Sequence, residues 1–321
     1  MDGYIIALIA VGCVVVCLTA WGVWENHAVQ CNSVEVASEK LPAAFDGFTF
    51  AHISDLHNAK FGRGQKNLLA RLQESAPDAI VITGDLIDKR RPGMRRALRF
   101  AELAVKIAPV YYVTGNHEAK SKEFPLLKEA LGRLGVRLLL DRAETIERAG
   151  EHIVLAGLSD ARFETADKRA FAAVSAEKLG HFLPQDGAFT VLLSHRPELF
   201  SVYRAAGVDL ALCGHAHGGQ FRIPLLGGVI APDQGLFPKY SEGLYSEEGK
   251  AMVVSRGLGN SSVPIRQTTA PEEVKVVLKS ENSPRKAAPP CVGAERRAAQ
   301  PVFSPEKRRR NEWYRDISAL S

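Results

Sequence analysis

Two nearly equal intervals constrain the fold of this chain more than any other feature of its sequence. Apolar runs are followed by the polar residues Asp55, Asp85 and Asn116, which are 30 and 31 residues apart. An interval of this length accommodates a strand, a crossover helix and the next strand, which is βαβ spacing. Because the carboxyl ends of parallel strands lie at one edge of a sheet, the three side chains are expected side by side there.

Further apolar runs extend this pattern. They predict strands at residues 48–53, 79–83, 136–140, 153–158, 191–193, 210–213, 251–255 and 274–278. Amphipathic segments predict helices at residues 65–76, 122–134 and 167–179. A chain of 321 residues that is 46% hydrophobic is long enough to bury such a core. The order of elements predicts an α/β fold with two packed sheets and helices outside them.

Five polar blocks accompany the predicted strands. They are Ser54-Asp55-Leu56-His57, Gly84-Asp85, Gly115-Asn116-His117-Glu118, Ser194-His195 and Gly214-His215-Ala216-His217. Five of the nine histidines fall inside these blocks, which scattered surface or core histidines would not explain. The other four are interpreted as surface or packing residues, and Cys213 as a small buried residue beside the last block.

The blocks supply carboxylate, amide and imidazole donors, which suit two divalent metal ions. A phosphoester resists hydrolysis because its negative oxygens repel a nucleophile and because water is a poor nucleophile at neutral pH. Two metals about 3.5–4 Å apart lower the pKa of a shared water and bind the phosphate oxygens. Mixed oxygen and imidazole shells suit Mn, Fe or Zn, of which Mn is favoured. The blocks therefore predict a metal-dependent phosphoesterase site.

The order DxH, GD, GNHE, H and GHAH resembles the signature of the calcineurin-like metallophosphoesterase superfamily, over about residues 50–217. The resemblance implies a four-layer α-β-β-α sandwich with two mixed sheets. It implies two sets of metal ligands that share Asp85 as the bridge: Asp55, His57, Asp85 and His217 for one metal, and Asp85, Asn116, His195 and His215 for the other. It also implies that His117 contacts the phosphate and protonates or orients the leaving oxygen.

Other segments resemble the membrane-associated phosphodiesterase branch of that superfamily. They are residues 57–62, 194–198, 217–220, 234–240 and 255–261. The branch includes enzymes similar to UDP-2,3-diacylglucosamine pyrophosphatase, which cleave a lipid-linked sugar nucleotide, although this chain lacks the twin-arginine signal of exported members. Lys60, Arg196 and Arg256 are candidates to contact the non-reacting part of an anionic substrate. The alternative for the arginines is that they bond loop carbonyls.

The first residues of the chain predict a membrane anchor. The segment Tyr4–Trp24 has 21 residues without a charge, about the length that a helix needs to cross a bilayer. A cleaved signal peptide is disfavoured because no Lys or Arg precedes the segment and because it exceeds the usual apolar core. A lipoprotein site at Cys13 is disfavoured because the apolar run continues past it. The nearest following cation is Lys40, so charge does not select a membrane face.

Composition divides the rest of the chain. We predict an anchor at residues 1–30, a catalytic domain at 31–279 and a disordered basic tail at 280–321, which carries +4 of the net charge of +5. The tail could lie on anionic lipid or be solvated. The nearly neutral body has no basic stripe or nucleic-acid-binding motif, so no nucleic-acid partner is expected. No protein partner is predicted either.

These observations predict a cell-membrane phosphoesterase that hydrolyses a phosphodiester or pyrophosphate bond, with a membrane- or envelope-linked substrate. A tethered general phosphomonoesterase is the second enzymatic interpretation. A non-enzymatic scaffold is a third, because some members of the superfamily have lost metal-binding or acid residues. All eight such residues are present in this chain, which disfavours a scaffold.

Overall fold

The computed structural model describes residues 3–5, 8–13, 16, 28–219, 222–223, 227–260 and 270–282. The chain divides into two compact units, Met1–Asn282 and Ser283–Ser321, and all described helices and strands belong to the first. Most of the predicted anchor and the predicted tail beyond Asn282 lie outside the described residues. No helix within the described ranges is both long and apolar enough to span a membrane.

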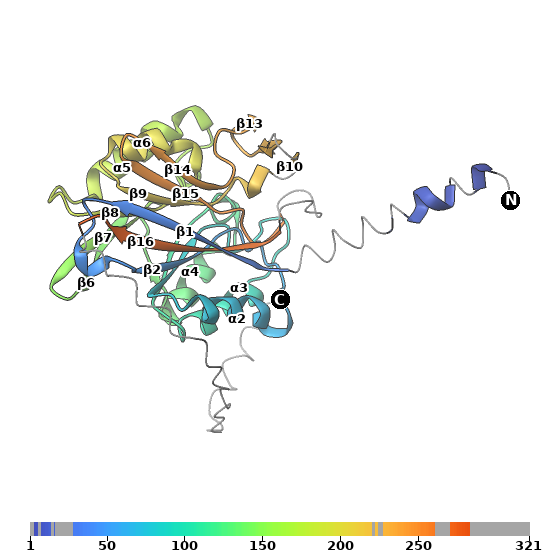
Figure 1. The fold of residues 1–321 in the computed structure, drawn as a ribbon, viewed down its shortest axis with the longest axis horizontal. Coiled ribbons are helices and arrows are strands. Elements are labelled where there is room, and N and C mark those ends of the chain that lie inside the picture. The colour runs from blue at the N-terminus through green and yellow to red at the C-terminus, as the bar shows by residue number, and fades with distance from the viewer. Residues whose placement is uncertain are drawn as a thin grey trace, which may run out of the picture. The chain divides into compact units, whose positions relative to one another are not determined.

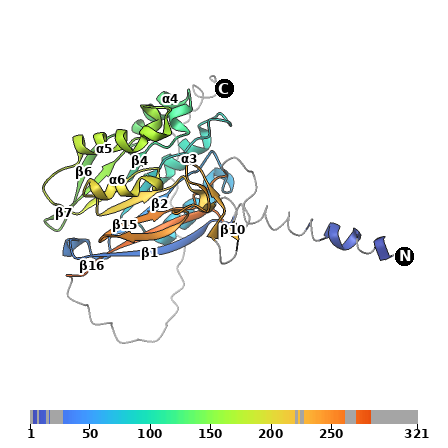
Figure 2. The same cartoon turned by 90° about the horizontal axis from the view of Figure 1, so that it is seen from above.

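The first sheet confirms the βαβ pattern. Its six strands have the order β1 (Gln30–Ser38), β16 (Glu272–Ser280), β2 (Thr49–Ile53), β3 (Ala79–Thr83), β4 (Val110–Val113) and β5 (Arg137–Leu138). Strands β2 to β5 are parallel and are connected by α2 (Lys66–Ser75), α3 (Arg95–Ala104) and α4 (Phe124–Arg133). Strand β16 is antiparallel to β2, and β1 is parallel to β16, so the sheet is mixed. Figure 2 shows β1 and β16 side by side along one border of the sandwich.

The second sheet is also mixed. Its order is β14 (Gly243–Glu247), β15 (Lys250–Val254), β9 (Leu210–Cys213), β8 (Thr190–Leu193), β7 (Glu151–Gly157) and β6 (Arg142–Arg148). The four inner strands are parallel, and the two outer strands are antiparallel to their neighbours. The helices α5 (Phe171–Phe182) and α6 (Phe200–Ala205) accompany this sheet.

Short elements complete the described part of the chain. Two small hairpins pair β10 (Arg222–Ile223) with β11 (Gly227–Gly228), and β12 (Ile230–Ala231) with β13 (Gly235–Leu236). The 3-10 helices are η1 (Ala43–Phe45), η2 (Arg63–Gln65), η3 (Glu118–Lys120), η4 (Ala161–Phe163), η5 (Lys168–Ala170), η6 (Pro197–Leu199) and η7 (His217–Gly219).

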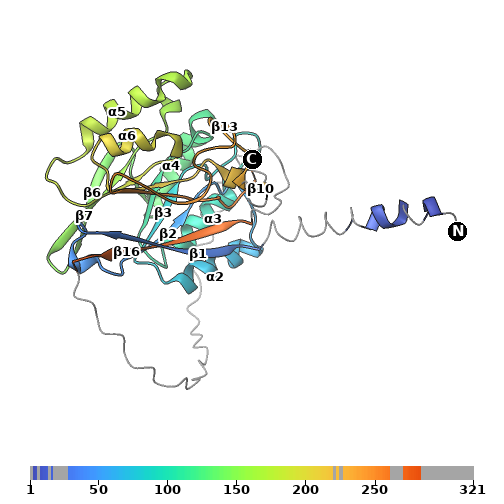
Figure 3. The same cartoon turned by 45° about the horizontal axis from the view of Figure 1, so that its top comes forward.

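Three apolar clusters hold the layers together. Figures 1 and 3 show the arrangement of the two sheets and their helices. Side chains such as Phe50, Val81 and Leu212 fill the space between the two sheets. Successive strand residues point to opposite faces, so Ile80 and Ile82 pack instead against α2, α3 and α4. A third cluster joins the second sheet to α5 and α6. The structure confirms the prediction of two packed sheets with helices outside.

Strand β1 was not predicted, and β16 ends later than expected. The sequence of β1 is mostly polar, and Val36 is its one buried residue, because β1 is an edge strand. Ser280, assigned to the tail by sequence, is the last residue of β16, where its hydroxyl donates to the Leu41 carbonyl. Edge strands lack the apolar pattern that reveals buried strands.

Candidate functional site

The five blocks meet where the two sheets present the carboxyl ends of their parallel strands. Asp55, Asp85 and Asn116 follow β2, β3 and β4 of the first sheet. His195 and His215 follow β8 and β9 of the second sheet. The two sheets therefore supply opposite sides of one site.

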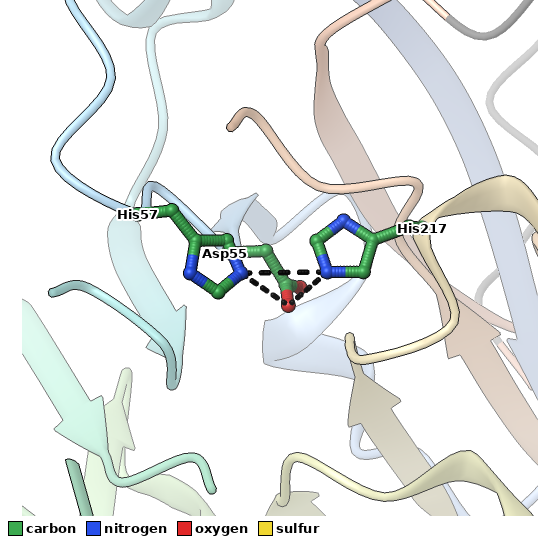
Figure 4. Close-up of side chains that lie close together, drawn as sticks. All are labelled: Asp55, His57 and His217. Carbon is green, nitrogen blue, oxygen red and sulfur yellow. Dashed lines mark hydrogen bonds and ion pairs between the residues drawn. The ribbon is translucent and has the colours of Figure 1, made fainter. Parts of the chain in front are cut away.

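Asp55, His57 and His217 form the first group of donors (Figure 4). His217 Nε2 lies 3.3 Å and His57 Nε2 lies 3.7 Å from Asp55 Oδ1. The two Nε2 atoms are 3.4 Å apart. Two imidazole nitrogens and one carboxylate oxygen that converge in this way suit a divalent transition metal.

Asp85, His195 and His215 form the second group. Asp85 Oδ2 is 3.3 Å from His195 Nε2, which is 3.1 Å from His215 Nδ1. Asp85 Oδ2 is also 3.6 Å from His57 Nε2 in the first group. One carboxylate oxygen therefore reaches both groups, which is the position that a bridging ligand requires.

The hydrogen bonds of the two carboxylates leave one oxygen of each directed at the histidines. Asp55 Oδ2 accepts from the Ser54 hydroxyl at 2.6 Å and from His215 N at 3.1 Å. Asp85 Oδ1 accepts from His117 N at 2.8 Å. Among the described residues, the buried Asp55 Oδ1 and Asn116 Oδ1 have no hydrogen-bond partner. Buried oxygens without donors are costly unless a cation binds them, so these residues fit a metal site.

The charges of the site favour bound cations. Burial opposes protonation of His195, but Asp85 and Asp55 outweigh it and raise the pKa of this imidazole to about 10. Burial likewise opposes ionisation of Asp55, but His217, His57 and His195 bring its pKa below the ordinary range. Without metal, the carboxylates thus hold a proton on His195, and a metal would take its place.

His117 lies beside the two groups and is oriented by a residue that the sequence interpretation missed. Its Nε2 is 4.0 Å from Asp85 Oδ2, and its Nδ1 is 3.1 Å from Asp88 Oδ1. His117 Nδ1 faces the buried Asp88 carboxylate and accepts from the Lys89 N–H at 3.3 Å, so Nε2 is the nitrogen that faces the site. Burial lowers the pKa of His117 to about 4, against the opposing charge of Asp85. Asp88 lies three residues after Asp85, which places it in the same turn.

Glu118, the last residue of its block, has a role that its sequence position alone does not reveal. Its carboxyl group accepts from the backbone N–H groups of Asp85 and Gly115, each at 2.8 Å, and of Ile87 at 3.1 Å. Burial and Asp85 raise the pKa of Glu118 to about 7. This buried side chain therefore joins the turns that follow β3 and β4.

Five of the seven predicted metal ligands have an uncommon backbone conformation. Asp55, His57, Asp85, His215 and His217 have positive φ angles between 47° and 69°. Such angles are uncommon for residues other than glycine and tend to cluster at functional sites. A Cβ on Gly214 would overlap the Ser54 hydroxyl, and a Cβ on Gly115 would overlap Asp85 Oδ1. The glycines of the blocks are thus required by close packing around the site.

We expect Glu118→Gln to destabilise the fold by about 1–3 kcal/mol, because the amide nitrogen cannot accept a hydrogen bond and leaves a buried N–H without a partner. The free energy of unfolding, measured by urea titration, checks this. Glu147→Gln on the exposed strand β6 is the matched control and should change it by less than about 0.5 kcal/mol. Equal stability of the two variants would contradict the role assigned to Glu118.

The structure does not favour the predicted substrate contacts of Arg196 and Arg256. The Arg196 side chain is 2% exposed and pairs with Asp160 at 2.8 Å and with Asp233 at 2.6 Å. Arg256 bonds Gln30 at 3.0 Å and lies 3.3 Å from Glu272. Both guanidinium groups are engaged by protein acceptors, which a sequence without tertiary contacts cannot show. Lys60 is exposed and stays a candidate.

Asp233 is a further residue that the sequence interpretation missed. Its Oδ2 lies 3.3 Å from His215 Nε2, the ring nitrogen opposite the one that faces His195. Arg196 and Lys168 pair with the same carboxylate. A carboxylate on the far nitrogen fixes the orientation of a metal-binding imidazole. Asp233 therefore orients His215, a member of the second group, through the ring nitrogen that does not face His195.

The comparisons with known proteins agree with this geometry. A family model described as calcineurin-like phosphoesterase matches residues 48–219. Three relatives illustrate the range of similar proteins. The chain is 29% identical over 263 residues to the uncharacterized metallophosphoesterase YkuE of Bacillus subtilis, covering 80% of this chain and 88% of that protein. It is 26% identical over 241 residues to the phosphodiesterase YaeI of Escherichia coli, covering 72% and 82%.

The third relative is a Danio rerio protein named transmembrane protein with metallophosphoesterase domain. The identity is 28% over 258 residues, covering 77% of this chain and 56% of that protein. The family match spans more than half of the 321 residues and includes every predicted metal ligand. The chain therefore belongs to the calcineurin-like phosphoesterase family and is a hydrolase that acts on phosphoester bonds.

Proposed function

We propose that this enzyme hydrolyses a phosphodiester or pyrophosphate bond in a membrane- or envelope-linked substrate. The observation that carries the chemical part is the pair of donor groups that Asp85 connects. The ligands would be Asp55, His57, Asp85 and His217 on one side, and Asp85, Asn116, His195 and His215 on the other. Manganese is the favoured metal, with iron and zinc as alternatives, because the donors combine oxygen and imidazole.

Bound metals would neutralise the phosphate oxygens and lower the pKa of a water molecule. Side chains of the protein would position the metals and deliver a proton. Asp55 and Asp85 each present one oxygen to the site because the other is held by hydrogen bonds. His117, oriented by Asp88, would deliver a proton to the leaving oxygen through Nε2. The charges of Asp85 and Asp88 raise the pKa of His117 against the effect of burial, which favours the protonated form that a general acid needs.

The membrane part of the proposal is supported by the uncharged segment Tyr4–Trp24, whose length matches a bilayer span. The named transmembrane relative supports it in a second way. A tethered phosphomonoesterase is the alternative, because the same donor groups would serve a monoester.

Substrate comparison tests the proposal. The full chain, purified in detergent and supplied with Mn²⁺, should hydrolyse bis(p-nitrophenyl) phosphate and a lipid pyrophosphate faster than p-nitrophenyl phosphate. Faster hydrolysis of the monoester would favour the tethered phosphomonoesterase. Failure on every substrate with metal bound would refute the proposed activity.

We expect Asn116→Asp to slow turnover by about tenfold or more while metal stays bound. A tenfold loss corresponds to about 1.4 kcal/mol of transition-state stabilisation. A third carboxylate would cancel part of the positive charge that attracts the phosphate. Metal content and kcat at saturating Mn²⁺ are measured together. Full activity with full metal content would contradict this account of the neutral amide.

A further inference from the structure

The strand topology places the start of the folded domain beside the site. The edge where the parallel strands of both sheets end and the five blocks meet is called the catalytic edge. Strand β2 leads into Asp55, and β16 runs antiparallel to β2, so β16 begins at the edge where β2 ends. Strand β1 is parallel to β16, with Gln30 opposite Glu272. The Gln30 side chain accepts a hydrogen bond from Arg256. A Cβ on Gly257, the residue after Arg256, would lie 2.7 Å from Asp55 Cβ. The first residue of β1 thus bonds a segment that packs directly against Asp55, a predicted metal ligand.

The uncharged segment that precedes the domain is close to this entry point in sequence. Trp24 is the last residue of the segment, and β1 begins at Gln30, six residues later. Six extended residues span at most about 20–22 Å. A surface that holds Trp24 therefore lies within about 20–22 Å of Gln30, which is at the catalytic edge.

An exposed apolar hairpin lies at the same edge. Ile230 and Leu236 are paired across β12 and β13, and they are 40% and 68% exposed, while the adjacent Phe237 is 62% exposed. Phe237 has a φ of 52°, a conformation that is costly for a bulky residue. Figure 3 shows β13 and the start of β1 at the same end of the domain.

The base of this hairpin is attached to the metal-binding turn. The Val229 N–H donates to the Gly219 carbonyl at 3.2 Å, and Gly219 closes η7, which begins at His217. The Phe237 N–H donates to the Val229 carbonyl at 2.8 Å, which closes the hairpin. Within the hairpin, Asp233 reaches His215. The exposed apolar side chains are therefore held beside the site by backbone contacts.

We propose that Ile230, Leu236 and Phe237 rest on the lipid bilayer, so that the catalytic edge faces the membrane. This inference depends on the membrane location in the proposed function. A bilayer is favoured over a second copy or a protein partner because the uncharged segment ends six residues before Gln30, and β1 begins there at the edge that carries the hairpin. An apolar hairpin beside the site would bring the donor groups to a phosphoester at the lipid headgroups.

Fluorescence quenching by lipid tests this orientation. The full chain is reconstituted in phosphatidylcholine vesicles with and without brominated acyl chains. Phe237→Trp adds one indole to the three native tryptophans, and subtraction of the unsubstituted protein isolates its emission. His152→Trp is the matched control, because His152 lies near the start of β7, at the opposite end of the parallel strands from the catalytic edge. Leu236→Trp is a second probe.

Brominated lipid should remove emission added at position 237 or 236 and leave that added at position 152 unchanged. Equal quenching of the indoles at positions 237 and 152 would overturn the proposal. An indole at position 237 that neither bromolipid nor acrylamide quenches would also overturn it and would indicate a protein partner or a second copy. Failure to float with vesicles would overturn both this inference and the membrane location. Hydrolysis of bis(p-nitrophenyl) phosphate in the same vesicles reports the phosphoesterase activity separately.

Discussion

Asp85→Asn is expected to lose bound metal and to reduce phosphodiester turnover by about 10³-fold or more, since bound metals contribute several kcal/mol to transition-state stabilisation. Asp85 Oδ2 is the atom that reaches both His57 at 3.6 Å and His195 at 3.3 Å. An amide in its place lacks the negative charge that holds two dications together, and its NH₂ group cannot act as a ligand. Metal content by mass spectrometry and kcat with saturating Mn²⁺ measure the two effects.

Asp186→Asn is the matched control, because this aspartate is exposed and lies in the loop before β8, at the opposite end of the parallel strands from the site. It should retain both metal and turnover. An Asp85→Asn protein that keeps two metals per chain and normal turnover would show that Asp85 is not the bridge. Because the amide keeps only one of the two oxygens, either the acceptor for His117 N or the metal-facing oxygen is lost, and circular dichroism is needed to confirm that the variant is folded.

The sequence predicted the parts of the site that depend on short-range order. Each predicted ligand follows a buried strand, and the parallel arrangement of β2, β3 and β4 brings Asp55 and Asp85 to one edge. In the structure, seven of the eight predicted residues are linked by side-chain distances of 4.0 Å or less, and Asn116 lies in the turn beside His117. Spacing predicted that Asp55, Asp85 and Asn116 lie at one edge, because parallel strands leave few alternatives, whereas the division of the ligands between two metals is what the family resemblance implies.

The residues that the sequence did not reveal act through contacts between distant segments. Glu118 bonds the turn at Asp85, and Asp233 reaches His215 from a hairpin that carries no strong strand pattern. Arg196 was a candidate substrate contact because arginines bind phosphate well, but three carboxylates surround its buried guanidinium. A single charged residue in a sequence does not show whether its partner is a ligand or another side chain.

His117→Asn is expected to reduce kcat by about 10²–10⁴-fold for a substrate with a poor leaving group, the usual contribution of a general acid. Metal content should not change, because His117 is predicted to bind no metal. The loss should be much smaller for an aryl diester, whose leaving group departs without a proton. The ratio of the two losses, measured with an alkyl and an aryl phosphodiester, separates proton donation from general damage to the site.

Asp88→Asn tests the same role through the charge that faces the ring. Asp88 Oδ1 lies 3.1 Å from His117 Nδ1, and its charge raises the pKa of the imidazole, so an uncharged amide there disfavours the protonated acid. We expect the alkyl diester to be affected more than the aryl diester, in the same direction as His117→Asn but less strongly, since the imidazole is still present. If both variants slow the two substrates equally, His117 holds the phosphate in place and another group protonates the leaving oxygen.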